Sequence, residues 1–426
     1  MDNRIKAKKK IVCKVLIFLW LLVMMVFPDI STVVKLAILS ALVVMVYEYH
    51  GCFIFSKNMG LGILLWELLF ALFLVNGIVH GFEFEMTLFE IYLIRPLVLL
   101  ILSPVILDED MYRSLIKILV GLTICIGLYN VIHIFGVLGI LPRIFIRSEG
   151  LVVVREGFLS IRASNQTALM FLAPFITTLF FRRREFGRSY SRWITVGFVL
   201  CMGTVLMSGR RALQVISILF LALNAWHILI FEKRKYQRRW GVWQLFVLLI
   251  ATVIAFVILN QTLHISVFMV YNTIRDAFNS DARSSILRTV QIRYLISYWK
   301  QKPLLGWGLS AYVDDYIQWK LTFTGKTQTV LWSYENFYVA LLFQTGLIGI
   351  GFIVVAMVFV FRRIYELYKR NCSNSIGTST LAVFAGATGF LITGSANPMV
   401  TSLWMWFIVF GAYNFASHNV PHNEGE

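Results

Sequence analysis

Long apolar stretches recur along the whole chain, and they constrain its fold more than any other feature of the sequence. Stretches of about 18 or more residues with almost no charge are long enough to cross roughly 30 Å of hydrocarbon as helices. Hydrophobic residues make up 58% of the 426 residues and charged residues only 14%. Soluble domains carry roughly a quarter charged residues. The sequence therefore predicts an all-α, polytopic integral membrane protein.

About twelve such spans are expected, forming a single transmembrane domain over 1–426. The predicted spans are 11–28, 31–47, 59–79, 86–107, 114–138, 164–181, 193–208, 212–231, 241–262, 336–361, 378–394 and 399–416. The largest polar interval, 263–335, separates the ninth and tenth spans.

The net charge of +17 follows from topology rather than from binding to nucleic acid. Short segments that would face the cytoplasm are rich in Lys and Arg, as the positive-inside bias requires. They are MDNRIKAKKK, RRREFGRSYSR, EKRKYQRRW and RRIYELYKR. We therefore expect both termini in the cytoplasm, membrane lipids as partners and no nucleic-acid partner.

The cysteine pattern indicates neither an external disulfide nor a metal site. The five cysteines are Cys13, Cys52, Cys125, Cys201 and Cys372. All fall in predicted spans or on the cytoplasmic side, and no CxxC or Cys/His ligand spacing occurs. We expect structural thiols, no metal and no cofactor.

Two predicted external segments, 139–163 and 263–335, are the polar parts of the chain. In the second, the apolar residues Ile286, Leu287 and Val290 have near-helical spacing, which predicts an amphipathic helix on the membrane surface. The following PLLGWG should end that helix.

Arginine is common on the predicted external side, where the positive-inside bias should deplete it. These arginines are Arg143, Arg147, Arg155 and Arg162 in the first segment, Arg210 and Arg211 in the turn MSGRRALQ, and Arg275, Arg283, Arg288 and Arg293 in the large loop. The planar guanidinium suits phosphate oxygens, and two cations in a short turn between spans call for an anionic partner. A diphosphate site is one interpretation, and pairing with nearby carboxylates is the other.

Two further charged residues stand at the spans themselves. Arg95 lies within a predicted span. Charged residues inside a membrane often have a function, although an ion pair with Glu67 or Glu90 would also explain this arginine. Glu335 opens the tenth span, where it could act as a general base or simply stabilise a helix N-terminus. Composition alone favours the second interpretation of Glu335.

Four motifs stand in a characteristic order: RASNQTALMFLAP, the turn SGRRAL, an arginine upstream of PLLGWG, and ENFY opening a span that continues to GLIG. Their order and spacing over roughly 155–350 resemble the O-antigen polymerase and O-antigen ligase superfamily of bacterial membrane glycosyltransferases. The layout of about twelve spans with a late external loop extends this likeness to the whole chain and is GT-C-like.

The resemblance implies a metal-independent, inverting glycan transfer from undecaprenyl diphosphate at the periplasmic face of the bacterial inner membrane. The segments 139–163 and 263–335 would then be periplasmic. Arg211 and Arg288 match the family's arginines, and with Glu335 they are the expected catalytic residues. The expected substrate-binding residues are Arg210, Arg293, Arg162, Arg155, Asn336, Asn165 and Arg95.

Glu335 occupies the position where ligases of the superfamily typically carry a histidine before the Asn. This departure favours a polymerase that joins lipid-linked repeat units into O-antigen or a related surface polysaccharide. The alternatives are a ligase that moves glycan to lipid A core and, in another class, a transporter or flippase for lipid-linked sugars. The implied partners are undecaprenyl-diphosphate-linked glycans and a chain-length regulator protein.

Overall fold

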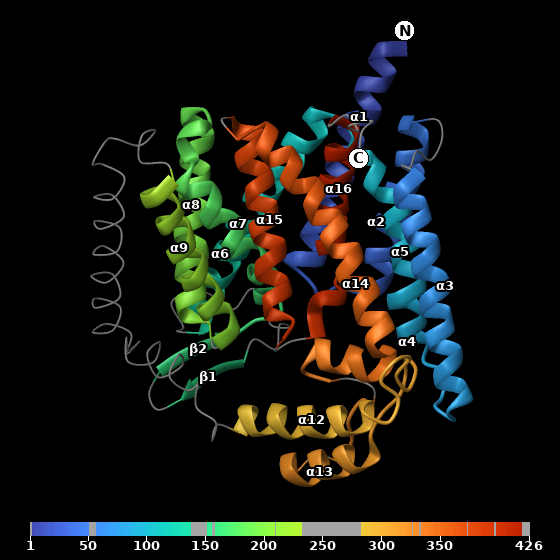
Figure 1. The fold of residues 1–426 in the computed structure, drawn as a ribbon. Coiled ribbons are helices and arrows are strands. Elements are labelled where there is room, and N and C mark those ends of the chain that lie inside the picture. The colour runs from blue at the N-terminus through green and yellow to red at the C-terminus, as the bar shows by residue number, and fades with distance from the viewer. Residues whose placement is uncertain are drawn as a thin grey trace. The chain divides into compact units, whose positions relative to one another are not determined.

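The computed structural model describes residues 2–50, 57–137, 151–155, 158–208, 210–231, 283–325, 327–331, 334–372, 374–395 and 398–419. Helices dominate these residues (Figure 1). The elements in chain order are α1 (Asp2–Met25), α2 (Thr32–His50), α3 (Lys57–Val79), α4 (Met86–Phe89), the π-helix η1 (Glu90–Ile94), α5 (Arg95–Leu102), the short 3-10 helix η2 (Ser103–Val105), α6 (Glu109–Val137), β1 (Leu151–Arg155), β2 (Phe158–Arg162), α7 (Gln166–Phe181), η3 (Arg183–Glu185), α8 (Arg188–Met207), α9 (Arg211–Phe231), α12 (Arg283–Trp299), α13 (Asp314–Thr324), α14 (Phe337–Arg370), α15 (Ser375–Thr393), η4 (Pro398–Thr401) and α16 (Leu403–Asn419).

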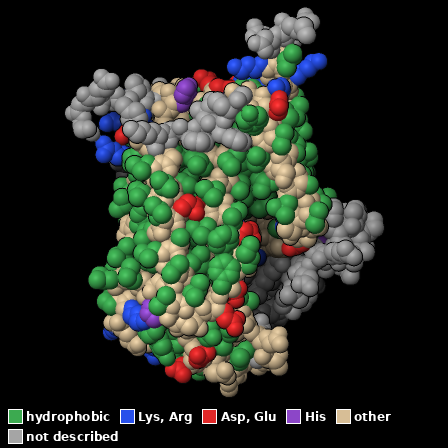
Figure 2. Space-filling view, turned by 90° about the vertical axis from the view of Figure 1, so that its right-hand side faces the viewer, with side chains coloured by type: hydrophobic (Ala, Val, Ile, Leu, Met, Phe, Trp, Pro, Cys, Tyr) green, Lys and Arg blue, Asp and Glu red, His purple; other side chains and the backbone are tan. Residues whose placement is uncertain are grey.

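Each predicted span coincides with helix except 241–262, which lies outside the described residues. Among the helices that the structure describes, 7 are long and apolar enough to cross a membrane. The chain is a polytopic helical membrane protein, and the count of about twelve spans stays a prediction. Figure 2 shows the face that includes α3, where hydrophobic side chains cover the middle and most charged ones lie towards the two ends.

A β-hairpin lies within the predicted external segment 139–163, as a local exception in a fold that is otherwise helical. β1 and β2 pair antiparallel, from Leu151 opposite Arg162 to Arg155 opposite Phe158. Both strands are rich in β-branched residues, LVVVR and FLSIR, which favour extended backbone over helix.

The chain divides into two compact units by its contacts. Unit 1 comprises 1–21, 31–117 and 281–426, and unit 2 comprises 22–30 and 118–280. In unit 1, α14 packs against α3, α12, α15 and α16. In unit 2, α7 packs against α8 and α9 and is buried along nearly its whole length.

α14 is interrupted at Gly346, whose φ of 64° lies in the left-handed region. The helix loses backbone hydrogen bonds there, and the loop after α12 replaces two of them. The amides of Leu347 and Ile348 donate to the carbonyls of Pro303 and Leu304 at 2.9 and 3.1 Å. The sequence element PLLGWG therefore docks into the kink of α14.

The same loop also donates hydrogen bonds to α14 on the other side of the kink. The amides of Trp307 and Gly308 donate to the carbonyls of Phe343 and Gln344 at 3.0 and 2.8 Å. These four backbone groups of α14, which the kink leaves without partners in the helix, are thus satisfied from a distant part of the chain. Hydrogen bonds on both sides of the kink therefore attach the loop after α12 to the first half of α14.

Substitution of Gly346 should destabilise the fold. A Cβ at this position would lie 2.2 Å from the carbonyl oxygen of Leu304, in addition to the left-handed φ. We expect Gly346→Ala to lower the free energy of unfolding by more than about 2 kcal/mol, seen as a lower thermal midpoint of the purified protein in detergent. Gly351→Ala is the control, because a Cβ there meets nothing within 4 Å. Equal midpoints for the two variants would contradict this account of the kink.

Candidate active site

α12 and α13 lie across the direction of the long helices of their unit, at the end where α14 begins (Figure 1). This arrangement brings Arg288 of α12 to Glu335, with Nε donating to Oε2 at 3.1 Å. The two side chains are 38% and 45% exposed. The ion pair is therefore accessible to a ligand rather than enclosed in the core.

Glu335 is held by the start of α14. The next residue, Asn336, is the N-cap, and its side-chain oxygen accepts from the amide of Val339 at 3.1 Å. Such a cap satisfies one of the free donors of the first turn. Glu335 thus stands beside the positive end of a long helix, as the helix-terminus interpretation expects, and its role as a general base stays a prediction.

Gln291 connects α12, α13 and the start of α14. Its side-chain oxygen accepts from the backbone amide of Asn336 at 3.1 Å, and its amide donates to the hydroxyl of Tyr316 at 3.2 Å. Gln291 is fully buried and lies three residues after Arg288, on the same helix face. The sequence interpretation did not include this residue, although a polar side chain among the apolar positions of α12 was a signal.

Tyr316 supplies a second polar group beside the pair. Burial raises the pKa of Tyr316 to about 12, and the negative charge of Glu335 adds to the shift. The phenol therefore stays protonated at neutral pH. The second carboxylate oxygen of Glu335, Oε1, has no hydrogen-bond partner among the described residues, so it is available to accept a proton.

Removal of the Gln291 contacts should misplace Glu335 without removing it. We expect Gln291→Leu to lower kcat on the order of a hundredfold, because small displacements of reacting groups have effects of this size, with a much smaller change in KM. Steady-state kinetics on lipid-linked repeat units would measure the split. Gln318→Leu, on the exposed side of α13, is the control for the loss of an amide. A wild-type kcat for Gln291→Leu would show that Gln291 only fills space.

Neither Arg95 nor Arg293, two predicted binding residues of unit 1, contacts Arg288 or Glu335 among the described residues. Arg293 is exposed on α12, and the described residues give it no ion pair. Arg95 pairs with Glu90 at 3.1 Å and donates to the carbonyl of Thr401 at 2.9 Å. The alternative that Glu90 is the partner of Arg95 is therefore confirmed, and a substrate role of either arginine stays a prediction.

The turn between α8 and α9, in unit 2, is anchored to the start of α7. The hydroxyl of Ser208 donates to Gln166 Oε1 at 3.0 Å and accepts from the backbone amide of Arg210 at 3.1 Å. The guanidinium of Arg210 also donates to the carbonyl of Ala163 at 3.4 Å. Arg211 then begins α9. Ser208 and Arg210, which flank the turn residue 209 outside the described part of the structure, are thus held against the start of α7.

Asn165, also in unit 2, has contacts that account for it without a substrate. It is buried, accepts from Asn130 Nδ2 at 3.2 Å and donates to the carbonyl of Val26 at 3.4 Å. Arg155 and Arg162 lie on β1 and β2, and their side chains lie outside the described part of the structure. The binding roles predicted for these three residues stay predictions.

A comparison with protein-family models gives one match. Residues 196–354 match the family model described as O-antigen ligase. The match supports the O-antigen ligase and polymerase superfamily for this part of the chain. The resemblance based on the sequence motifs is confirmed, and the superfamily consists of glycosyltransferase-like enzymes of lipopolysaccharide synthesis. No curated protein matches the chain.

The superfamily domain contains the residues that the resemblance assigns to catalysis, Arg211, Arg288 and Glu335. It also includes the PLLGWG loop and the kink of α14, so the docked loop is part of the domain. Among the described residues, no group of three or more His, Cys, Asp or Glu side chains could hold a metal ion. Free thiols are described at Cys13, Cys125, Cys201 and Cys372, and Cys52 lies outside the described residues.

Proposed function

We propose that this protein is a polymerase that joins undecaprenyl-diphosphate-linked repeat units into O-antigen or a related surface polysaccharide. The observation that carries the proposal is the accessible pair of Arg288 and Glu335 at the start of α14, within a domain of the superfamily. We further propose that the site faces the periplasm from the inner membrane, with both termini in the cytoplasm.

The reaction requires a base and an anion-binding group, and the pair supplies both. Oε1 of Glu335 accepts the proton of the attacking sugar hydroxyl as its oxygen bonds to the anomeric carbon of the donor. The bond from that carbon to the diphosphate oxygen breaks, and the configuration inverts. Arg288 stabilises the departing diphosphate. A diphosphate-binding role of Arg210 and Arg211, which the resemblance implies, stays a prediction.

The ion pair gives this reaction an order of events. Without substrate, Arg288 donates to Glu335 and neutralises its charge. A bound diphosphate offers the same guanidinium a stronger, bidentate partner. Substrate binding thereby also releases Oε2 of Glu335 from the guanidinium, so that the carboxylate is unpaired when it acts as a base.

The residue type at position 335 favours a polymerase over a ligase. A carboxylate stands there instead of the histidine that is typical of ligases. Glu335 also remains half-exposed, as a base that receives a large glycan acceptor must be. The expected partners are undecaprenyl-diphosphate-linked glycans, membrane lipids and a chain-length regulator protein.

Glycan analysis of a deletion strain tests the proposal. We expect lipopolysaccharide that carries a single repeat unit, with long chains restored by the wild-type protein. Uncapped core together with accumulated lipid-linked polymer would instead identify a ligase. Accumulation of single lipid-linked units in the cytoplasmic leaflet would identify a transporter, and either result would overturn the polymerase proposal.

A further inference from the structure

The hydroxyl of Tyr316 is a buried polar group close to the candidate active site. The side chain is 2% exposed, and its oxygen accepts from Gln291 Nε2 at 3.2 Å. A phenol can donate as well as accept. Among the described residues, no group accepts the proton of this hydroxyl. Because a buried donor without an acceptor costs free energy, an acceptor for this proton is expected in at least one state of the site.

Gln291 determines the direction of its hydrogen bond with Tyr316. The backbone amide of Asn336 can only donate, so it fixes the side-chain oxygen of Gln291 on its own side, at 3.1 Å. The side-chain nitrogen of Gln291 must then face Tyr316 and donate to it. The phenol oxygen is therefore the acceptor in this contact, and its proton is left for another group.

The same side-chain amide brings the phenol close to Glu335. Its two ends bind Tyr316 and the backbone of Asn336, the residue that follows Glu335. Burial and, as a smaller cause, the negative charge of Glu335 raise the pKa of Tyr316 to about 12. The phenol therefore keeps its proton at neutral pH and remains a donor near an anionic acceptor.

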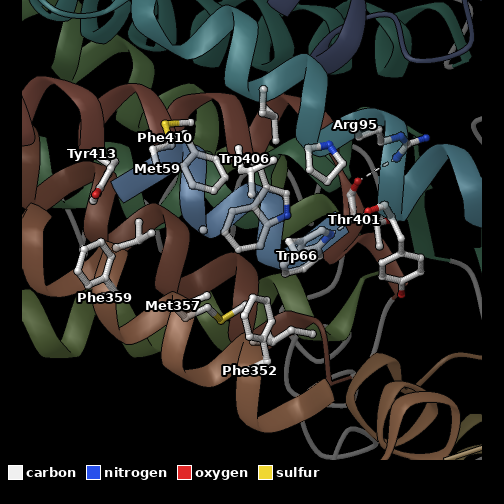
Figure 3. A pocket seen from close by; sticks show the side chains of 18 of the residues that line it. Met59, Trp66, Arg95, Phe352, Met357, Phe359, Thr401, Trp406, Phe410 and Tyr413 are labelled. Carbon is white, nitrogen blue, oxygen red and sulfur yellow. Dashed lines mark hydrogen bonds between the residues drawn. The ribbon is translucent and has the colours of Figure 1, made fainter. Parts of the chain in front are cut away.

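Donors at the neighbouring groove are already engaged. Phe337, two residues after Glu335, lines an apolar groove of about 300 Å³ among α3, α5, α14 and α16 (Figure 3). The two indole N–H groups of this groove donate to backbone carbonyls, each at 2.8 Å. Arg95, the one charged side chain among its described lining residues, is held by Glu90 and by a backbone carbonyl. Tyr316, by contrast, has a proton to offer.

We propose that Tyr316 is a positioning residue of the site, whose hydroxyl takes over Oε2 of Glu335 when a diphosphate engages Arg288. Without substrate, Oε2 accepts from Arg288 at 3.1 Å. Once the guanidinium turns to the diphosphate, the phenol donates to the vacated Oε2 and keeps Oε1 directed at the acceptor hydroxyl. The inference rests on the proposed function, which supplies the diphosphate.

A neutral donor suits a general base better than a cation does. A guanidinium beside a carboxylate strongly favours its ionised form and so makes it a poor proton acceptor. A phenol forms a weaker hydrogen bond because it carries no charge. The exchange of Arg288 for Tyr316 thus preserves the orientation of Glu335 while it restores the ability of the carboxylate to accept a proton.

Tyr316→Phe tests the proposal, because it keeps the ring and removes only the hydroxyl. We expect kcat for chain extension to fall by about tenfold to a hundredfold, with a change in KM of less than about twofold. The acidic limb of the pH profile of kcat should move to higher pH, since a carboxylate that loses a hydrogen-bond donor is protonated more readily. Steady-state rates of the purified full-length protein in detergent, measured across pH, give both results.

Tyr294→Phe is the control for the loss of a phenol oxygen. The ring centroid of Tyr294 lies 6.1 Å from that of Tyr316, and its hydroxyl has no hydrogen bond among the described residues. This variant should keep the wild-type kcat and the wild-type pH profile. In a Glu335→Gln background, Tyr316→Phe should lower kcat by less than about a further twofold, because the hydroxyl acts through Glu335.

Two results would overturn the proposal. One is a wild-type kcat and pH profile for Tyr316→Phe, and the other is an undiminished effect of Tyr316→Phe in the Glu335→Gln background. If Tyr316→Phe did not fold, Gln291→Glu would decide, since a carboxylate there can only accept from the phenol and so consumes its proton. We expect a kcat at least about tenfold lower, and a wild-type kcat would equally overturn the proposal.

Failure of this role differs from failure of the proposed function. The glycans of the deletion strain judge the polymerase proposal without any variant of Tyr316. Single-unit lipopolysaccharide in that strain, together with an unaffected Tyr316→Phe enzyme, would remove only the role of the phenol.

Discussion

Replacement of Glu335 by Gln is expected to lower kcat for polymerisation by about 10²–10⁴-fold, the usual contribution of a positioned general base. Glutamine keeps the shape of the side chain but cannot accept the proton of the attacking hydroxyl. KM for the lipid-linked repeat unit should change little, because the proposed mechanism assigns diphosphate binding to arginines and not to Glu335. The measurement is the rate of chain extension by the purified enzyme in detergent.

Asp314→Asn is the matched control for Glu335→Gln, since Asp314 is an exposed carboxylate on neighbouring α13. It should leave kcat at the wild-type value. If Glu335→Gln extended chains at the wild-type rate, Glu335 would serve only to stabilise the start of α14. Another residue would then have to be the general base.

Replacement of Arg288 by Ala is expected to lower kcat/KM by about 10²–10³-fold, as loss of one group that stabilises developing charge does. The variant loses a ligand of the diphosphate and leaves Glu335 without its partner. Arg288→Lys should recover only part of the activity, because an ammonium group keeps the charge but not the planar pair of donors.

Binding separates these two consequences of Arg288→Ala. The affinity for undecaprenyl diphosphate should fall together with kcat/KM, whereas Lys300→Ala, an exposed cation just after α12, should change neither. Unchanged affinity in Arg288→Ala would mean that Arg288 positions Glu335 but does not touch the diphosphate.

Helix positions near the candidate site could be predicted from local sequence. The apolar spacing before PLLGWG predicted the helix that is observed as α12, Arg283–Trp299. The ENFY motif predicted the opening of a span, and Asn336 caps α14 there. Both features depend on neighbours within a few residues, on side-chain spacing and on cap chemistry.

The contacts that build the site could not be predicted in the same way. Arg288 and Glu335 are 47 residues apart in the chain. The role of Gln291 depends on groups from α13 and α14 that the sequence does not place beside it. The sequence shows a glycine at position 346, but it does not show that α14 bends there or that PLLGWG docks at the bend. The hydrogen bonds at this bend come from a loop that is distant in the chain.

Local sequence patterns were sufficient to predict a helical membrane protein and to show the superfamily motifs in order. Hydrocarbon allows no unpaired backbone groups, so long apolar segments must become helices whatever surrounds them. The pairing of Arg288 with Glu335 and the contact of Gln291 with the start of α14 became visible only in the folded structure. Those features arise from packing between segments far apart in the chain, which the local pattern of residues does not specify.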